Sequence, residues 1–317
     1  MRVHRTLESL PDFLKAVVTI GTFDGVHRAH REIITQLTDE ARACGGESVI
    51  ITFDPHPRRV LSPGAGALHL LTTLEEKISL IADLGVDHLV VVPFTRAFSE
   101  IAARAYVTEF LVARFHPHTI ILGYDHHFGH NREGNIHLLR ILAPEYDFRV
   151  VEIPEQVCRN LTVSSTKIRQ YLAAGDVAMA AELLSYPYFV SGRVVHGEAR
   201  GRSLGFPTAN LAFDEDEKLV PAEGVYAAIA EIPGRDGAPA ERFLAAVNIG
   251  RLPTFGGRKL RLEAYLLDFD RDIYGLNVRI HFRAYLRGDR KFDSVEALVR
   301  QMEADVTEVR RLLAADR

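Results

Sequence analysis

The stretch Val17-Val-Thr-Ile-Gly-Thr-Phe-Asp-Gly-Val-His-Arg-Ala-His30 decides the fold of the first half of the chain. Its first four residues form an apolar, β-branched run that is typical of a buried strand. Gly21 and Gly25 then permit a tight turn and close approach to the backbone. An amphipathic helical segment follows, with apolar residues at helical spacing at Ile33, Ile34, Leu37 and Ala41. Strand, glycine turn and helix in this order predict an α/β unit.

The same alternation continues outward from this stretch. Further apolar runs that predict buried parallel strands are Val49–Phe53, Leu89–Phe94, Thr119–Gly123 and Phe148–Ile153. Helical stretches lie between them, one of them marked by Leu74, Ile78, Ile81 and Leu84. The pattern predicts a doubly wound, Rossmann-like α/β domain over residues 1–185, with ligands beyond the carboxyl ends of the strands.

After Tyr186-Pro187 the pattern changes, and candidate strands follow one another without helices between them. They are Phe189–His196, Val225–Glu231, Phe243–Ile249, Leu260–Leu267 and Val278–Leu286. This succession of strands predicts an antiparallel β-barrel domain over residues 186–317. A terminal helix closes the domain, and we expect its apolar stripe to pack on the barrel: Val295, Leu298, Val299, Met302, Val306, Val309 and Leu313.

Composition limits the class of protein. The 317 residues are 47% hydrophobic and 25% charged, with a net charge of −4, which argues against a broad nucleic-acid-binding surface. No apolar run approaches the roughly 20 residues that span a bilayer, and the N-terminus does not resemble a secretory signal. Cys44 and Cys158 are far apart, so we expect reduced thiols, a cytoplasmic location and no membrane partner. Oligomeric state is left open.

His27 and His30 stand three residues apart at the start of the first predicted helix. A helix N-terminus attracts phosphate through its free N–H groups and its partial positive charge. Two imidazoles beside it can donate hydrogen bonds to charge that develops on a phosphate. The plain alternative is a pair of exposed histidines on a surface helix.

Ser164-Ser-Thr-Lys-Ile-Arg169 opens another predicted helix and offers hydroxyl and cationic groups within one turn. A phosphate cradle and a simple helix cap both fit this segment. The histidines of the 116–130 region lack metal-ligand spacing and are interpreted as partly exposed loop residues.

The most informative stretch of the second domain runs from Gly192 to Leu211. It lacks the GxxxxGK[ST] pattern of a Walker A loop. Gly197, Gly201 and Gly205 nevertheless stand near Arg200 and Arg202, an arrangement in which backbone N–H groups can surround phosphate oxygens. A hydroxyl and an amide oxygen suited to Mg²⁺ follow at Thr208 and Asn210. The glycines by themselves would also fit an ordinary turn.

The motifs of the first domain resemble a known family. GTFDGVHRAH and SSTKIR are similar to the HxGH and SSTxxR pair of the nucleotidyltransferase superfamily. Thr52–Pro57 and Leu122–Gly134 are similar to flavin- and nucleotide-binding segments of bacterial FAD synthetases. The resemblance implies that the FMN phosphate attacks the α-phosphate of ATP without a covalent enzyme intermediate. It implies catalytic roles for His27 and His30, ATP or diphosphate contacts at Gly21, Phe23, Gly25, Asp125, Ser165, Thr166 and Arg169, and flavin contacts at Pro55 and Pro57.

One residue departs from that motif. Ala29 stands where the family usually has glycine between the two histidines. Because glycine lets a ligand approach the backbone closely, the methyl group predicts a loss of rate in adenylylation.

The second domain resembles the riboflavin kinases. Their PTAN motif is intact at Pro207–Asn210, and further matches follow in order through Gly224–Tyr226, Asn248–Gly250, Leu262–Phe269 and Ile273–Gly275. The resemblance implies that Glu263 is the catalytic base for the ribityl hydroxyl. It places Mg²⁺ and ATP at Thr208 and Asn210, further ATP contacts at Gly197, Gly201, Arg202 and Gly205, and a flavin contact at Asn248.

Together these resemblances predict one chain with two activities: riboflavin and ATP give FMN and ADP, then FMN and ATP give FAD and diphosphate. Two alternatives stay open. One is a riboflavin kinase with a weakened adenylyltransferase site, and the other is a flavin-binding sensor without turnover.

Overall fold

The structure is a computed structural model that describes every residue except 63–67, 124–125, 154–162, 198–200, 202–203, 214–216, 235–237, 255–256 and 317. The chain divides into two compact units, Met1–Ser165 and Thr166–Arg317. The domain boundary that the sequence predicts after residue 185 lies about 20 residues beyond this division. It stays a prediction. None of the described helices combines the length and apolar content needed to cross a bilayer.

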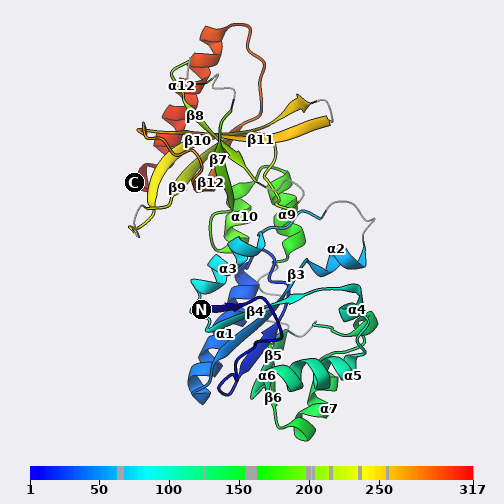
Figure 1. Cartoon of the computed structure of the whole chain (residues 1–317). Coiled ribbons are helices and arrows are strands. Elements are labelled where there is room, and N and C mark those ends of the chain that lie inside the picture. The colour runs from blue at the N-terminus through cyan, green and yellow to red at the C-terminus, as the bar shows by residue number, and fades with distance from the viewer. Residues whose placement is uncertain are drawn as a thin grey trace. The chain divides into compact units, whose positions relative to one another are not determined.

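The first unit is built on a six-stranded parallel sheet in the order β1-β4-β3-β2-β5-β6 (Figure 1). Its strands are β1 (Arg2–His4), β2 (Val17–Ile20), β3 (Ser48–Asp54), β4 (His88–Pro93), β5 (Thr119–Gly123) and β6 (Arg149–Ile153). The chain leaves β2 toward β3 on one side and later returns to β5 on the other side, so the predicted doubly wound fold is confirmed. Only β1, a short strand on the edge of this sheet, was absent from the sequence prediction, since three mostly exposed residues carry little periodic signal.

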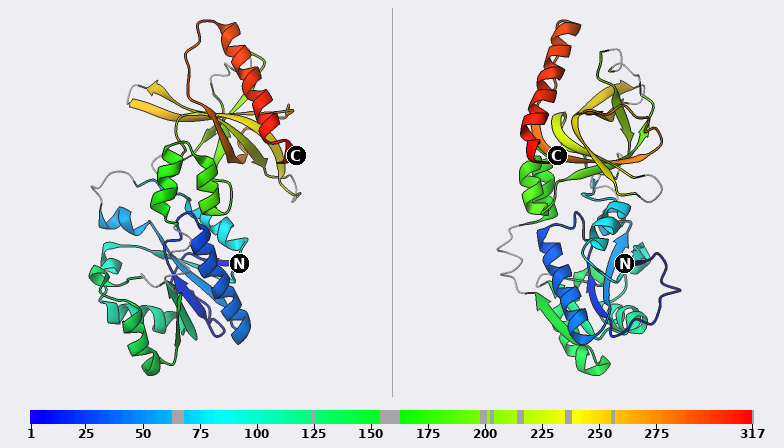
Figure 2. Two further views of the ribbon diagram at one scale, coloured as in Figure 1. Left: turned by 180° about the vertical axis from the view of Figure 1, so that it is seen from behind. Right: turned by 90° about the vertical axis from the view of Figure 1, so that its left-hand side faces the viewer.

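Helices cover this sheet on both faces (Figure 2). The longest is α1 (Arg28–Cys44), which ends at Gly45 in the left-handed conformation with φ of 64°. Its buried residues Ile34, Leu37 and Ala41 confirm the predicted stripe. Burial of an isoleucine or leucine side chain contributes about 1.5–3 kcal/mol, so this face holds the helix to the sheet.

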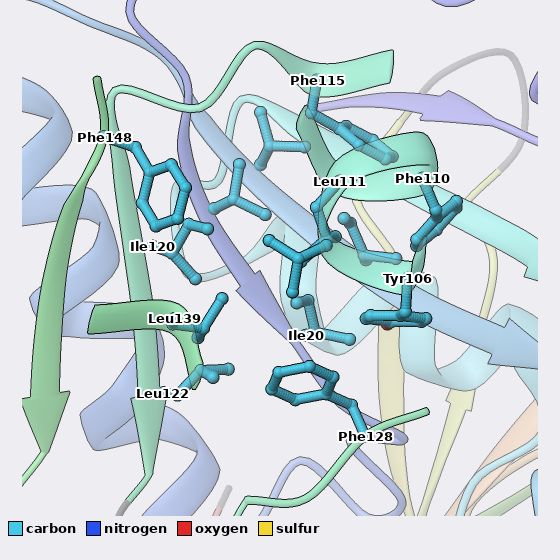
Figure 3. Close-up of a cluster of buried hydrophobic side chains, with 14 of the residues drawn as sticks. Ile20, Tyr106, Phe110, Leu111, Phe115, Ile120, Leu122, Phe128, Leu139 and Phe148 are labelled. Atoms are coloured by element: carbon cyan, nitrogen blue, oxygen red, sulfur yellow. The ribbon is translucent and has the colours of Figure 1, made fainter. Parts of the chain in front are cut away.

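The opposite face of the sheet packs against an aromatic and aliphatic core (Figure 3). Ile20, Ile120 and Leu122 come from the strands, whereas Leu139 comes from a helix. Tyr106 and Phe128 stack with ring centroids 5.3 Å apart.

The remaining helices of this unit are α2 (Pro57–Leu61), α3 (Leu74–Ala82), α4 (Arg96–Ser99), α5 (Ala103–Ala105), the π-helical η1 (Tyr106–Val112), α6 (Ala113–Phe115), the 3₁₀ turn η2 (His130–Arg132) and α7 (Ile136–Tyr146).

The second unit is a closed antiparallel barrel in the order β10-β11-β8-β7-β12-β9. Its strands are β7 (Phe189–Val195), β8 (Thr208–Ala212), β9 (Gly224–Ile232), β10 (Glu241–Thr254), β11 (Gly257–Leu266) and β12 (Asn277–Arg287). The predicted barrel is confirmed. Strand β8 was interpreted only as a ligand-binding segment, yet it pairs with both β7 and β11 and closes the barrel.

Two helices precede the barrel, α9 (Ser165–Ala173) and α10 (Val177–Leu184), and α12 (Val295–Leu312) with the 3₁₀ turn η4 (Ala314–Asp316) ends the chain. Figure 2 shows α12 along the strands of the barrel. Val309 and Leu313 join a buried cluster with barrel residues, as predicted. The prediction was wrong for Val295, which is 57% exposed because it lies in the first turn, beyond the part of α12 that packs on this cluster.

Candidate functional sites

The first candidate site lies at the carboxyl end of β2, where the strand order of the sheet reverses. This is the place where open α/β sheets bind ligands. The turn after Ile20 contains three residues with positive φ, Phe23 (47°), Gly25 (81°) and Val26 (36°). A β-branched residue in this region is strained, so the turn needs support from outside.

That support reaches the turn through Asp24, a buried residue in its middle, which binds backbone groups of another segment. Its Oδ1 accepts hydrogen bonds from the N–H groups of Leu71 (2.9 Å) and Thr72 (3.2 Å). The Gly25 N–H donates to Thr72 Oγ1 (3.1 Å), and Ser165 Oγ donates to the Asp24 carbonyl (3.1 Å). Ser165, predicted from the sequence, therefore lies against the histidine-bearing turn.

His27 and His30 form a stacked pair at the start of α1. Their ring centroids are 3.7 Å apart with an angle of 13° between the planes. His27 is the N-cap, and its Nδ1 accepts the His30 N–H at 3.4 Å. Because Nδ1 accepts, the proton of a neutral His27 ring is assigned to Nε2, which can donate to a ligand. The pair is therefore not the exposed surface pair of the plain alternative.

Burial sets the charge of this pair. It lowers the pKa of His27 to about 4, although the Asp24 carboxylate opposes the shift. Burial, His27 and Lys77 together lower the pKa of His30 well below its ordinary value. Both imidazoles are thus neutral near pH 7 and act as hydrogen-bonding groups. The buried His30 Nδ1 has no hydrogen-bond partner within the described part of the chain.

The other residues predicted for this site fall in several places. Phe23 is buried with its ring 5.1 Å from that of His30. Thr166 and Arg169 follow Ser165 in α9, confirming that the SSTKIR segment opens a helix, but they belong to the second unit. Their contact with phosphate stays a prediction. Asp125 lies outside the described residues.

A pocket of about 440 Å³ opens beside this turn. Gly21 and Pro57 line it, whereas Pro55 is exposed and does not. Its wall carries the aromatic residues Phe53, Phe94, Phe98, Tyr106 and Phe128, the last two of which reach it from the core of Figure 3. Its basic lining residues are His56, Arg58, Arg96, His126, His127, His130 and Arg132.

The segments Thr52–Pro57 and Leu122–Gly134, which resemble flavin- and nucleotide-binding segments, supply part of this lining, whereas Phe94, Phe98 and Tyr106 were not predicted. The aromatic residues come from four separate segments of the chain. In the sequence, each of them is equally typical of a buried core residue. His126, His127 and His130 were interpreted as loop histidines, and the structure brings them to one cavity. The available signals were their closeness in sequence and the similarity of Leu122–Gly134 to binding segments of FAD synthetases.

The second candidate site is a row of polar side chains across three strands of the barrel. Asn248 of β10 faces Glu263 of β11, and Glu263 faces Asn210 of β8. Leu262, Ala264 and Leu266 are buried, so the alternate face that carries Glu263 and Tyr265 is the one open to a ligand. Thr208 is two residues before Asn210 and shares that face.

A pocket of about 360 Å³ covers this face. Thr208, Asn248 and Glu263 line it together, as does Gly201. Arg261 Nη2 lies 2.9 Å from Glu263 Oε2 and orients the carboxylate. Phe206 and Tyr265 meet edge to face at 5.1 Å on the wall, and Phe292, Leu298, Met302 and Val306 add apolar surface. The middle of the α12 stripe, Leu298 to Val306, therefore serves the pocket as well as the barrel.

A second pocket of the barrel, about 460 Å³, shares one wall with the first. Thr208 lines both. On the far side the Tyr274 ring stacks on His196 with centroids 3.8 Å apart. Two ligands bound in these pockets would meet at Thr208.

The glycines of the 197–205 segment have distinct roles. A Cβ atom on Gly197 would overlap the Asn210 amide, and one on Gly201 would overlap the Phe206 carbonyl. Gly205 has φ of 84°, which favours glycine. Arg202 lies outside the described residues.

Fold and sites define a two-part enzyme that handles nucleotides, with a parallel α/β unit and a barrel that carries a carboxylate beside a hydroxyl and amides. Comparison with known proteins gives each part its family. Residues 11–167 match the family model described as FAD synthetase, and residues 184–313 match the one described as riboflavin kinase.

Relatives cover both parts at once. A bifunctional riboflavin kinase/FMN adenylyltransferase of Listeria monocytogenes is 38% identical over 95% of this chain and 93% of its own. The enzyme of that name from Escherichia coli K12 is 35% identical over 91% and 90%. A solved structure described as a macrolide-efflux protein from Streptococcus pneumoniae is 30% identical, covers 98% of both chains and has a TM-score of 0.84. The macrolide-efflux description belongs to the Streptococcus pneumoniae protein and is not carried over to this chain.

The chain belongs to the family of bifunctional riboflavin kinases/FMN adenylyltransferases. It uses ATP to convert riboflavin to FMN and ADP, and then FMN to FAD and diphosphate.

Proposed function

We propose that Glu263 is the base of the kinase reaction and that the 360 Å³ pocket holds riboflavin. In this scheme the ribityl hydroxyl gives its proton to Glu263 while its oxygen attacks the γ-phosphorus of ATP, and the bond to the β-phosphate oxygen breaks to release ADP. One observation carries the proposal: Glu263 stands in register between Asn248 and Asn210, on the wall that Thr208 shares with the second pocket. ATP then occupies the second pocket, with its phosphates toward Thr208 and the 197–205 segment.

Mg²⁺ is part of this proposal. The Thr208 hydroxyl and the Asn210 amide oxygen are hard oxygen ligands on one face of β8, which suits an ion that keeps waters and shares phosphate oxygens. When bound, the ion would neutralise charge on the transferred phosphoryl group.

For the adenylyltransferase reaction we propose that His27 and His30 bind the ATP phosphates. An FMN phosphate oxygen attacks the α-phosphorus, and the α–β bridging bond breaks to release diphosphate. Neutral imidazoles donate hydrogen bonds to oxygens whose charge grows during this step. Gly21, Phe23, Gly25, Asp125, Ser165, Thr166 and Arg169 complete the proposed nucleotide site.

The 440 Å³ pocket is the proposed FMN site. Its aromatic wall suits an isoalloxazine ring, and its histidines and arginines suit a phosphate. Gly21 connects it to the histidine turn, so bound FMN would lie next to bound ATP.

Two further predictions belong to this proposal, one on the location of the protein and one on the boundary between its two domains. The cytoplasmic location is supported by the scarcity of cysteine, two residues in 317. The functional boundary near residue 185 is supported by the start of the riboflavin kinase match at residue 184.

The test is Glu263→Gln with chromatography of the flavin products. We expect FMN formation to fall by about 10²–10⁴-fold, the contribution of a positioned base, while added FMN is still converted to FAD. The double change of His27 and His30 to Ala should do the reverse. Near-normal FMN formation by Glu263→Gln would refute the assignment of the base, and persistence of both reactions in excess EDTA would refute the role of Mg²⁺.

A further inference from the structure

Lys77 is a buried lysine in α3, only 5% exposed. Lysine is rarely buried to this extent, because removal of its charge from water is costly. The residues around it in α3 already have structural tasks: Thr73 and Glu76 form a capping box at the start of the helix. The ammonium group of Lys77 donates a hydrogen bond to a residue of β3 outside the helix.

A chain of hydrogen bonds connects this ammonium group to the histidine turn. Lys77 Nζ donates to Thr52 Oγ1 at 3.3 Å, and Thr52 Oγ1 donates to the carbonyl of Thr22 at 3.2 Å. Thr52 is fully buried near the carboxyl end of β3, and Thr22 lies directly after Gly21. The contact thus joins α3, β3 and the turn that carries His27 and His30.

The charge of Lys77 also acts on the pair. After burial and His27, it is the third cause that lowers the pKa of His30. The charged or titratable groups that shift these pKa values are Asp24 for His27, and His27 and Lys77 for His30. Since the histidines are neutral near pH 7, Lys77 is a cation whose charge acts on His30.

We propose that Lys77 is a positioning residue of the adenylylation site, which orients the histidine turn through Thr52 and supplies a fixed buried positive charge that favours the ATP polyphosphate. The inference rests on the proposed role of His27 and His30. It assigns Lys77 no contact with substrate.

A purely structural role makes a different prediction. Methionine has a similar length and volume and carries no charge to desolvate, so it would fill the same space at no loss of stability. If Lys77 only fills space, Lys77→Met leaves ATP use unchanged. If Lys77 acts by charge, the same variant is defective toward ATP while it stays folded.

The experiment compares Lys77→Met, Lys77→Arg and the surface control Lys15→Met in the full chain. For Lys77→Met we expect kcat/KM for ATP in FMN adenylylation to fall by about 10- to 100-fold, as for other outer partners of functional groups. The pKa of His30, followed by NMR of ¹⁵N-histidine-labelled protein, should rise, which moves the acid limb of the adenylylation pH profile upward. Lys77→Arg should recover part of the rate, and Lys15→Met should match wild type.

Riboflavin kinase activity of each variant is the internal control and should not change. Unchanged kcat/KM for ATP and an unchanged His30 pKa in Lys77→Met would overturn the proposal. So would parallel loss of both activities and of melting temperature, because Lys77 would then be structural. Absence of FAD formation in the wild-type chain would instead contradict the two-activity function itself.

Discussion

At the scale of single residues, the two sites differ in how their side chains are held. Glu263 is positioned by its strand, and its neighbours across the barrel are set by register. His27 and His30 are positioned by a strained turn whose residues Asp24 and Gly25 depend on hydrogen bonds with Leu71 and Thr72 from elsewhere in the unit. We therefore expect the adenylylation site to be the more sensitive to changes outside it.

The effect of the Ala29 methyl group on adenylylation can be tested with a single substitution. It lies half-buried in the first turn of α1 between the two histidines. If the methyl group crowds the nucleotide by about 1 kcal/mol, Ala29→Gly raises kcat/KM for ATP in adenylylation by about 5-fold. Steady-state kinetics of FAD formation check this, with FMN formation as the control. An equal or lower rate would show that the site accommodates alanine.

At the scale of elements, the start of α1 couples ionisation to stability. The pKa of His27 is about 4 in the folded chain, against an ordinary value of 6.5. Below pH 6.5 the unfolded state therefore binds more protons than the folded state. Stability must then fall as the pH falls toward 4.

The size of this effect gives a second prediction. Between pH 6.5 and 4, His27 should reduce the unfolding free energy by up to about 1.4 kcal/mol per pH unit. Denaturant unfolding at pH 7 and pH 5 measures the slope in wild type and in His27→Asn, which keeps an N-cap acceptor. The variant should show the smaller slope. Equal slopes would mean that His27 does not titrate as described.

Helix α12 is held to the barrel by a buried ion pair at the wall of the 360 Å³ pocket. Arg287 at the end of β12 contacts Asp305 through three hydrogen bonds of 2.6–3.1 Å. Gln301 Nε2 adds a contact to Asp305 Oδ1 at 2.9 Å. The side chains of Arg287 and Asp305 are only 13% and 9% exposed.

Loss of one partner leaves the other charge buried, so Asp305→Asn should cost about 3–5 kcal/mol of barrel stability. It should also weaken riboflavin binding, because Arg287 and Asp305 line the pocket. The matched control is Asp268→Asn, which removes the exposed ion pair to Arg310 of the same helix and should cost at most about 1 kcal/mol. Thermal unfolding and riboflavin titration measure both variants, and similar losses in the two would contradict the importance of burial.

At the scale of the whole molecule, each activity has its own unit and its own pockets. The two barrel pockets are lined by described residues from 194 onward, and the 440 Å³ pocket by described residues up to 132. Neither described set borrows a residue from the other. Damage to one site should therefore leave the other site working.

A mixing experiment tests this independence. We expect Glu263→Gln chains to make very little FMN, and chains with His27 and His30 changed to Ala to make very little FAD. Mixed with riboflavin, ATP and Mg²⁺, the two variants should form FAD, because FMN released by one chain is adenylylated by the other. If wild type forms FAD and the mixture forms none, FMN must pass within a single chain.

The sequence by itself determined the two fold classes, because apolar periodicity records which strands are buried on both faces and which on one. It also determined Glu263, Thr208 and the histidine pair as candidates, because their motifs are short and continuous. Only the tertiary structure decided which face of β11 is open and that β8 closes the barrel. It also decided that five aromatic residues from separate segments share one pocket, and that Lys77 is buried and linked to the histidine turn. These features join residues far apart in the chain, and pairing register and burial depend on packing that no local pattern encodes.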